Sequence, residues 1–412
     1  MEFLISTSAL PLFLVMLTAA LLSPIVAQVV RIPASVSLVA IGMLAGLPFL
    51  GLESSALAGA SSIGLVFAFF LIGSAIDTSR LGRLGTRALL FAIVAFTSAL
   101  LLGWLLGTKI LGLGTIDALL VGVVFGAAAP FSKQLAARLE TTEARDSTSL
   151  QAANELGEIL RLFAFIILLA LRGTKSLVGF VEAPWALGLL GTLAGAIAIA
   201  LVLTFFGSRW FGRSTRAAGL GFLVFSLAGF GAAALGILIG LPPAFASFVS
   251  GLALGRFAPE GSLLQERMLF VGRNLFLPLA LVPAGMGLAS MLSADAPRVG
   301  FSVVAAIMTA GLAIIPRFLA GLALLPFGPL SRFRQLAMLA TAPGQEPSTL
   351  FFVLYLASAG FAKGYGPAIL IGLLPALWLL ESISGGQGGQ ESRRQRSTVL
   401  PGAAPGRRKS RS

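Results

Sequence analysis

The chain has 412 residues, of which 57% are hydrophobic and only 11% are charged, and its mean hydropathy is +0.96. This composition excludes a water-soluble protein, because a folded chain in water needs more polar residues to cover its surface. The formal net charge is +13, but most basic residues stand singly between apolar runs, which is typical of membrane topology signals rather than of a nucleic-acid-binding surface.

Thirteen apolar runs approach the length of about 20 residues that a helix needs to cross a bilayer. They are 8–28, 34–51, 61–77, 86–107, 115–137, 149–171, 184–207, 217–239, 242–256, 268–290, 299–325, 335–358 and 364–383. We therefore predict an all-α polytopic membrane protein with about 13 transmembrane helices in residues 1–383. Residues 384–412 are rich in Gly, Ser and Arg, and we expect them to form a basic, disordered cytoplasmic tail.

The distribution of Lys and Arg predicts the orientation of these spans. Connections that follow odd-numbered spans carry 14 basic residues, the opposite connections carry five, and the tail carries seven. We therefore expect a multi-pass protein of the bacterial inner membrane, with the N-terminus outside and the C-terminus in the cytoplasm.

An internal repeat with an offset of about 210 residues relates the two halves of the chain. The recurring positions are Gly42 and Gly46 with Gly251 and Gly255, Gly73 with Gly285, and Ala129-Pro130 with Ala342-Pro343. The copies lie an odd number of spans apart, so we expect them to have opposite orientations in the membrane. Inverted repeats of this kind are common in secondary transporters.

Proline interrupts the fifth and twelfth spans at matching places in the repeat. The fifth contains Ala129-Pro130, and the twelfth contains Pro343-Gly344 followed by Glu346. Proline inside a helix removes a hydrogen bond, which a membrane tolerates only where protein or water satisfies the freed groups. We expect broken helices whose ends hold a charged substrate near the midplane, with simple proline kinks as the alternative.

Polar residues gather at the start of the sixth span, namely Asn154, Glu155, Glu158 and Arg161. Residues three or four apart share a helical face, and charges inside a membrane mark a functional path by default. Burial favours a protonated carboxyl group and a nearby arginine favours a carboxylate, so such a group can bind either a proton or a cation. The alternative is a structural Glu–Arg pair, which we favour for Glu155. Arg317, inside the eleventh span, also needs a partner.

The sequence contains neither cysteine nor histidine. Disulfides and thiolate metal sites are therefore excluded, and proton chemistry must depend on carboxylates and the basic residues that compete with them. We expect no cofactor, and no metal beyond a monovalent cation at Glu158. We also expect no enzyme activity, because the paired aspartates of an intramembrane enzyme are missing as well.

In their order along the chain, these features resemble the membrane domain of the sodium/hydrogen exchanger superfamily, and within it the bacterial monovalent cation/proton antiporter-2 branch. The likeness covers roughly residues 10–383. It is carried by Arg31-Ile32-Pro33 with Gly42 and Gly46, Gly64-Leu65-Val66 to Gly73, Ile76-Asp77, Ala129-Pro130, the polar start of the sixth span, Gly251-Leu252-Ala253-Leu254, Pro283-Ala284-Gly285-Met286 and Pro343-Gly344-Gln345-Glu346.

The resemblance implies a homodimer with a dimer domain and a moving core domain, in which spans five and twelve are crossed broken helices. It places the family's ion-binding aspartate at Glu158, the polar residue before it at Gly157, and the membrane lysine or arginine at Arg317. This chain departs from the family pattern at the first break, where Ala128-Ala129-Pro130 lacks hydroxyl groups, at Gly157, and in having glutamate at position 158.

We therefore predict an alternating-access antiporter that exchanges Na⁺ or K⁺ for protons. Glu158 would bind the proton and the cation in turn, Arg317 would compete with the cation, and Asn154 and Glu155 would assist. Its partners would be these ions, the lipid bilayer and a second copy of the chain, and not nucleic acid. Two alternatives stay open: a transport-inactive membrane sensor or scaffold of the same fold, and an organic-anion symporter of a related fold.

Overall fold

The structure of the chain is a computed structural model that describes residues 9–30, 34–47, 58–76, 85–125, 144–174, 218–238, 242–258, 262–294 and 299–323, with six single positions besides (32, 194, 198, 201, 202 and 205). All regular structure in these residues is helical, which confirms the predicted all-α class. The spans predicted at 335–358 and 364–383, the tail, and all but five positions of the span at 184–207 lie outside the described residues.

Helices occupy every predicted span that falls on the described residues. They are α1 (Ala9–Val30), α2 (Ala34–Ala45), α3 (Ala58–Ala75), α5 (Thr86–Lys109), α6 (Thr115–Phe125), α8 (Ala144–Thr174), α11 (Ala218–Leu238), α12 (Pro243–Leu254) with the 3₁₀ turn η3 (Gly255–Phe257), α13 (Leu263–Val271), the π-helical turn η4 (Gly272–Phe276), α14 (Leu277–Ala294) and α15 (Val299–Ala323). α13, η4 and α14 follow one another without interruption.

The described helices have the length and the surface of a membrane protein. Three stretches, Leu89–Lys109, Gly221–Leu238 and Leu263–Ala289, are long and apolar enough to cross a bilayer. Large apolar side chains on α1 and α11 face outward, and Val29 and Leu238 are 78% and 80% exposed. Such exposure is unfavourable in water, but lipid tails are as apolar as these side chains.

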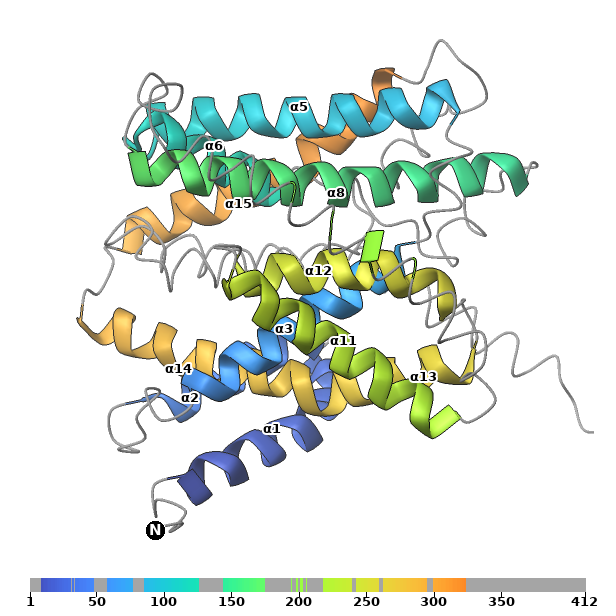
Figure 1. Ribbon diagram of the computed structural model, residues 1–412. Helices are drawn as coiled ribbons and strands as arrows, with labels where there is room; N and C mark the ends of the chain where they lie inside the picture. The colour runs from blue at the N-terminus through green and yellow to red at the C-terminus, as the bar shows by residue number, and fades with distance from the viewer. Residues whose placement is uncertain are drawn as a thin grey trace, which may run out of the picture.

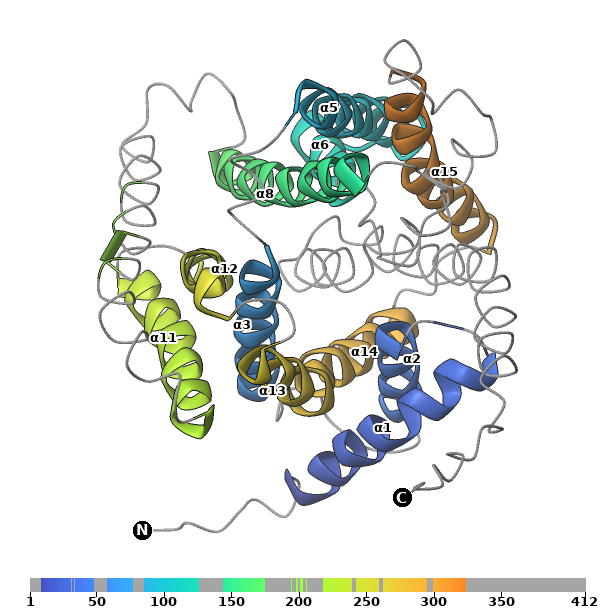
Figure 2. The same cartoon turned by 90° about the vertical axis from the view of Figure 1, so that its right-hand side faces the viewer.

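The helices form two groups, which both views of the molecule separate. α5, α6, α8 and α15 lie together at the top of Figures 1 and 2, and α1, α2, α3, α11, α12, α13 and α14 lie below them. Extensive helix packing among the described residues stays within each group. We call them the upper group and the lower group.

Packing in the lower group repeats with the offset seen in the sequence. α2 packs against α14, and α12 packs against α3. In each interface glycines face the backbone of the other helix: Gly42 with Val282, Gly46 with Met286 and Gly285 with Val39 in the first, and Gly251 with Phe70, Gly255 with Ser74 and Gly73 with Phe248 in the second. Every residue of one set has its counterpart about 210 positions away in the other. The glycines that revealed the repeat therefore allow the close approach of the helices.

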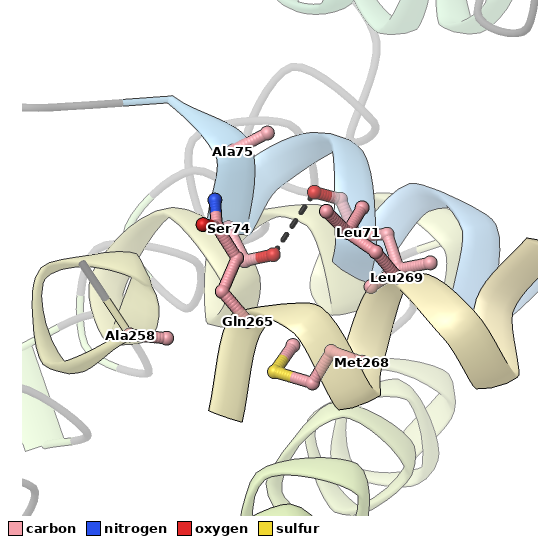
Figure 3. A pocket seen from close by; sticks show the side chains of 7 residues that line it. All are labelled: Leu71, Ser74, Ala75, Ala258, Gln265, Met268 and Leu269. Carbon is pink, nitrogen blue, oxygen red and sulfur yellow. Dashed lines mark hydrogen bonds between the residues drawn. The ribbon is translucent and has the colours of Figure 1, made fainter. Parts of the chain in front are cut away.

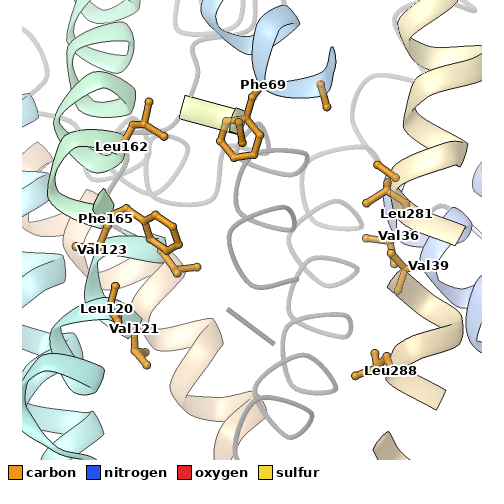
Figure 4. Packing of buried hydrophobic residues seen from close by; sticks show 14 of the residues in the cluster. Val36, Val39, Phe69, Leu120, Val121, Val123, Leu162, Phe165, Leu281 and Leu288 are labelled. Carbon is orange, nitrogen blue, oxygen red and sulfur yellow. The ribbon is translucent and has the colours of Figure 1, made fainter. Parts of the chain in front are cut away.

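Buried apolar residues from the two groups point toward one another (Figure 4). On one side they include Leu162 and Phe165 of α8, and on the other Leu281 of α14. Phe163 of α8 makes an edge-to-face contact with Phe245 of α12, with ring centroids 5.7 Å apart and an interplanar angle of 84°. α8, the helix that carries the predicted ion site, therefore contacts the lower group directly.

Candidate functional site

α8 presents its polar residues on a stretch that is buried in the protein. Glu155 is 9% exposed and Arg161 is fully buried, while the side chain of Glu158 keeps 13% of its exposure. Ala152 and Ala153 are buried beside them. These small residues let neighbouring helices come close to the face that carries the charges.

Arg161 joins two helices of the upper group. Its Nη2 donates to Oε2 of Glu158 at 2.5 Å, three residues earlier on α8. Its Nη1 donates to the backbone carbonyl oxygen of Val124, in the last turn of α6, at 3.1 Å. A buried guanidinium group is very unfavourable unless it is paired and hydrogen-bonded, and these two contacts meet that requirement. The Glu–Arg pair that the sequence allowed is therefore present at Glu158.

Arg317 brings a second guanidinium group to the site from α15. It is 3% exposed and lies close enough to Arg161 and Glu158 to interact with both electrostatically. It directly follows Pro316, whose carbonyl oxygen accepts a hydrogen bond from Oγ of Ser98 on α5 at 3.5 Å. The sequence indicated that Arg317 lies inside its span and needs a partner, and in the structure it lies near Glu158. Its competition with the cation stays a prediction.

Four charged side chains thus form what we call the charged cluster: Glu155, Glu158, Arg161 and Arg317. Asn154 lies on the same turn of α8, but its side chain is outside the described residues. The predicted helix breaks at Ala129, Pro130, Pro343, Gly344 and Glu346 are outside them as well, so their crossing stays a prediction. Two carboxylates and two guanidinium groups make the cluster formally neutral, and one added proton or monovalent cation gives it one positive charge.

Sequence reasoning missed a second ion pair, which joins α8 to α6. Nε of Arg172, in the last turn of α8, lies 2.9 Å from Oδ1 of Asp117 in the first turn of α6. Both side chains are about one quarter exposed. The available signal was Asp117 itself, a carboxylate at the start of an apolar span. Arg172 falls one residue beyond the predicted span 149–171, whereas α8 continues to Thr174.

A small cavity lies elsewhere, between α3 and α13 in the lower group (Figure 3). Its volume of about 10 Å³ has room for about one water molecule. It is lined by Leu71, Ser74, Ala75, Ala258, Gln265, Met268 and Leu269, and Oγ of Ser74 donates to the carbonyl oxygen of Leu71 at 2.9 Å. The lining contains no charged side chain and is remote from the cluster in the fold, so we do not assign the function to it. Among the described residues there is also no group of three or more acidic side chains that could hold a metal ion.

Residues 16–377 match the family model described as "Sodium/hydrogen exchanger, transmembrane". The Na(+)/H(+) antiporter NhaS5 of Synechocystis sp. is 26% identical over 281 residues, which are 66% of this chain and 39% of that protein. The chain thus spans about two fifths of the length of this curated relative.

Two structures of the sodium proton antiporter MjNhaP1 from Methanocaldococcus jannaschii have a similar fold. The structure at pH 8 has a TM-score of 0.61 at 18% identity and covers 91% of this chain and 94% of its own. The structure from electron microscopy has a TM-score of 0.63 at 17% identity, with coverage of 98% and 100%. At such identities the likeness concerns the fold alone.

Proposed function

The chain belongs to the sodium/hydrogen exchanger family, and we propose that it exchanges a monovalent cation, Na⁺ or K⁺, for protons across a membrane. The single observation that carries this proposal is the charged cluster, which lies buried in the helices of an otherwise apolar protein. Charges inside a membrane are rare and mark ion pathways by default. The name of the curated relative supports the same class of reaction.

Competition for one carboxylate is enough to couple the two fluxes. A carboxylate with a bound proton is neutral and has no affinity for a cation, whereas the ionised form attracts one. Since the cluster is neutral by itself, a bound proton and a bound monovalent cation leave it with the same charge. Neither form is therefore strongly favoured over the other by charge alone, so the occupant can change with the concentrations on either side.

We assign the shared site to Glu158, with Glu155 as its neighbour on the same face of α8. Glu158 retains some exposure, which gives an ion access, and it interacts with both arginines of the cluster. Glu155 is more deeply buried and adds a second negative charge. Asn154 precedes Glu155 on the same helix and would supply a neutral oxygen ligand.

Alternating access would arise from movement of the upper group relative to the lower group. The charged cluster lies in the upper group, and extensive packing among the described residues does not cross between the groups. Among the described residues, such movement would leave the extensive helix packing within each group intact. We further propose a homodimer, with the N-terminus outside, the C-terminus inside and residues 384–412 as a cytoplasmic tail.

Proton flux in proteoliposomes tests the proposal. A pH-sensitive dye inside the vesicles should respond to NaCl, KCl or LiCl but not to choline chloride. Glu158→Gln should abolish the response, whereas Glu266→Gln, the same change at an exposed carboxylate of α13, should preserve it. Loss of the response in Glu155→Gln alone would move the site to that residue. A folded wild type that responds to no cation would refute antiport and leave the sensor or the organic-anion symporter.

A further inference from the structure

We propose that Arg161 is a positioning residue that ties the carboxylate of Glu158 to the end of α6 and thereby sets the affinity of the site for its cation. This inference rests on the proposed function, and it gives Arg161 a role distinct from that of Arg317. It follows from the two contacts of one guanidinium group, which reach two different helices.

The guanidinium group is well suited to hold two acceptors in a fixed relation. It is planar and carries its N–H donors in a rigid fork, and here separate nitrogens donate to Glu158 and to the carbonyl oxygen of Val124. Arg161 is also the largest fully buried side chain in the described part of the chain. A side chain packed on all sides has little freedom, so the position of the Glu158 carboxylate is fixed relative to α6.

α6 is itself held firmly, so it provides a stable reference for the carboxylate. It packs against α8, the helix that carries Arg161. Along its length it packs closely against α5, where Gly103 approaches the backbone of Gly122. The tie through Arg161 therefore connects Glu158 to a rigid unit of three helices.

The same contact determines how a cation meets Glu158. A guanidinium group 2.5 Å from Oε2 already occupies one side of the carboxylate, so an incoming monovalent cation must share the carboxylate with a tethered positive charge. That repulsion weakens cation binding. Removing Arg161 should therefore tighten the binding of the cation, whereas loss of a merely structural contact would lower the amount of active protein without changing its affinity.

The experiment measures the apparent KM for Na⁺ and the maximal rate in proteoliposomes for the wild type, Arg161→Gln and Arg161→Lys. We expect the KM of Arg161→Gln to fall roughly tenfold or more. Lysine keeps the charge but has no fork, so the KM of Arg161→Lys should lie between those two values. Arg172→Gln is the matched control, because it removes an arginine that also pairs across α6 and α8 but lies far along α8 from Glu158; its KM should equal that of the wild type.

A second measurement covers the case in which Arg161→Gln fails to fold. It compares the thermal stability of three variants: Glu158→Gln, Arg161→Lys and the double variant Glu158→Gln/Arg161→Gln. The comparison reports the interaction energy of the ion pair, since removing both partners of a buried ion pair costs less stability than removing one. The double variant should therefore be at least as stable as Glu158→Gln. An unchanged KM in both Arg161 variants would overturn the inference, as would a fall in the KM of Arg172→Gln equal to that of Arg161→Gln. In either case, cation-dependent flux of the wild type would still support the proposed function. A wild type without cation-dependent flux would overturn both.

Discussion

Replacing Gly285 by alanine should push α14 away from α2 and destabilise the protein. A Cβ atom on Gly285 would overlap the carbonyl oxygen of Val39 and lie 3.0 Å from the backbone nitrogen of Met43. Backbone atoms cannot move aside as the end of a flexible side chain can. The helices must therefore separate, and the contacts on both sides of the interface are lost.

The magnitude follows from comparison with Gly287, two residues further along the same helix. A Cβ atom on Gly287 meets no atom within 4 Å, so Gly287→Ala changes only helix propensity, which favours alanine by up to about 1 kcal/mol. Gly285→Ala receives the same gain, but overpacking of a tight interface costs about 1–3 kcal/mol. The two variants should differ in free energy of unfolding by about 1–3 kcal/mol, with Gly285→Ala the less stable.

Thermal unfolding of detergent-solubilised protein, followed by tryptophan fluorescence, measures this difference under matched conditions. Gly73→Ala should behave like Gly285→Ala, because Gly73 is its counterpart in the repeat and faces the backbone of Phe248. Equal melting temperatures for Gly285→Ala and Gly287→Ala would refute the argument that glycine permits this close approach. Destabilisation by Gly285→Ala but not by Gly73→Ala would refute the equivalence of the two interfaces.

Three further predictions concern the upper group and its contact with the lower one. Asp117→Asn should lower stability by less than about 1 kcal/mol, because the pair with Arg172 is partly exposed; a melting temperature many degrees lower would contradict this. Phe245→Ala removes the edge-to-face partner of Phe163, so the maximal transport rate should change while the KM for Na⁺ stays within about twofold of the wild-type value. A change in the KM without a change in the maximal rate would contradict this prediction. Arg317→Gln should reduce transport at least about tenfold and Arg317→Lys should restore part of it, since the cluster needs the charge; equal activity of both variants would count against this.

Hydropathy predicted the described helices well, because lipid imposes one simple rule on membrane-spanning segments: backbone groups must bond within a helix and side chains must be apolar. The repeat could also be detected in the sequence. Glycines such as Gly42 and Gly251 recur in it because a Cβ atom at these positions would overlap the backbone of the facing helix. These signals are local in the sequence. They need no knowledge of which helix lies opposite.

The partners inside the site could be predicted only in part. The pairing of Glu158 with Arg161 was accessible, because a separation of three residues places both on one helical face. The bond from Arg161 to the carbonyl oxygen of Val124 was not, because every residue has the same backbone acceptor and only the packing of α6 on α8 selects one. The Asp117–Arg172 pair was missed for a related reason, since it depends on where α8 ends.

A purely structural role explains only half of the charged cluster. Holding α6 against α8 takes one ion pair, and Asp117–Arg172 already provides one at a site where partial exposure keeps the desolvation cost low. Glu158 and Arg161 form another ion pair, which lies within α8. Arg161 is fully buried there, and at such a site an ion pair is often no better for stability than apolar packing. Glu155 and Arg317 then add two more buried charges to the same place. Buried charge of both signs beyond what the packing requires is unfavourable for stability alone, and it is what a site needs if it must accept and release an ion.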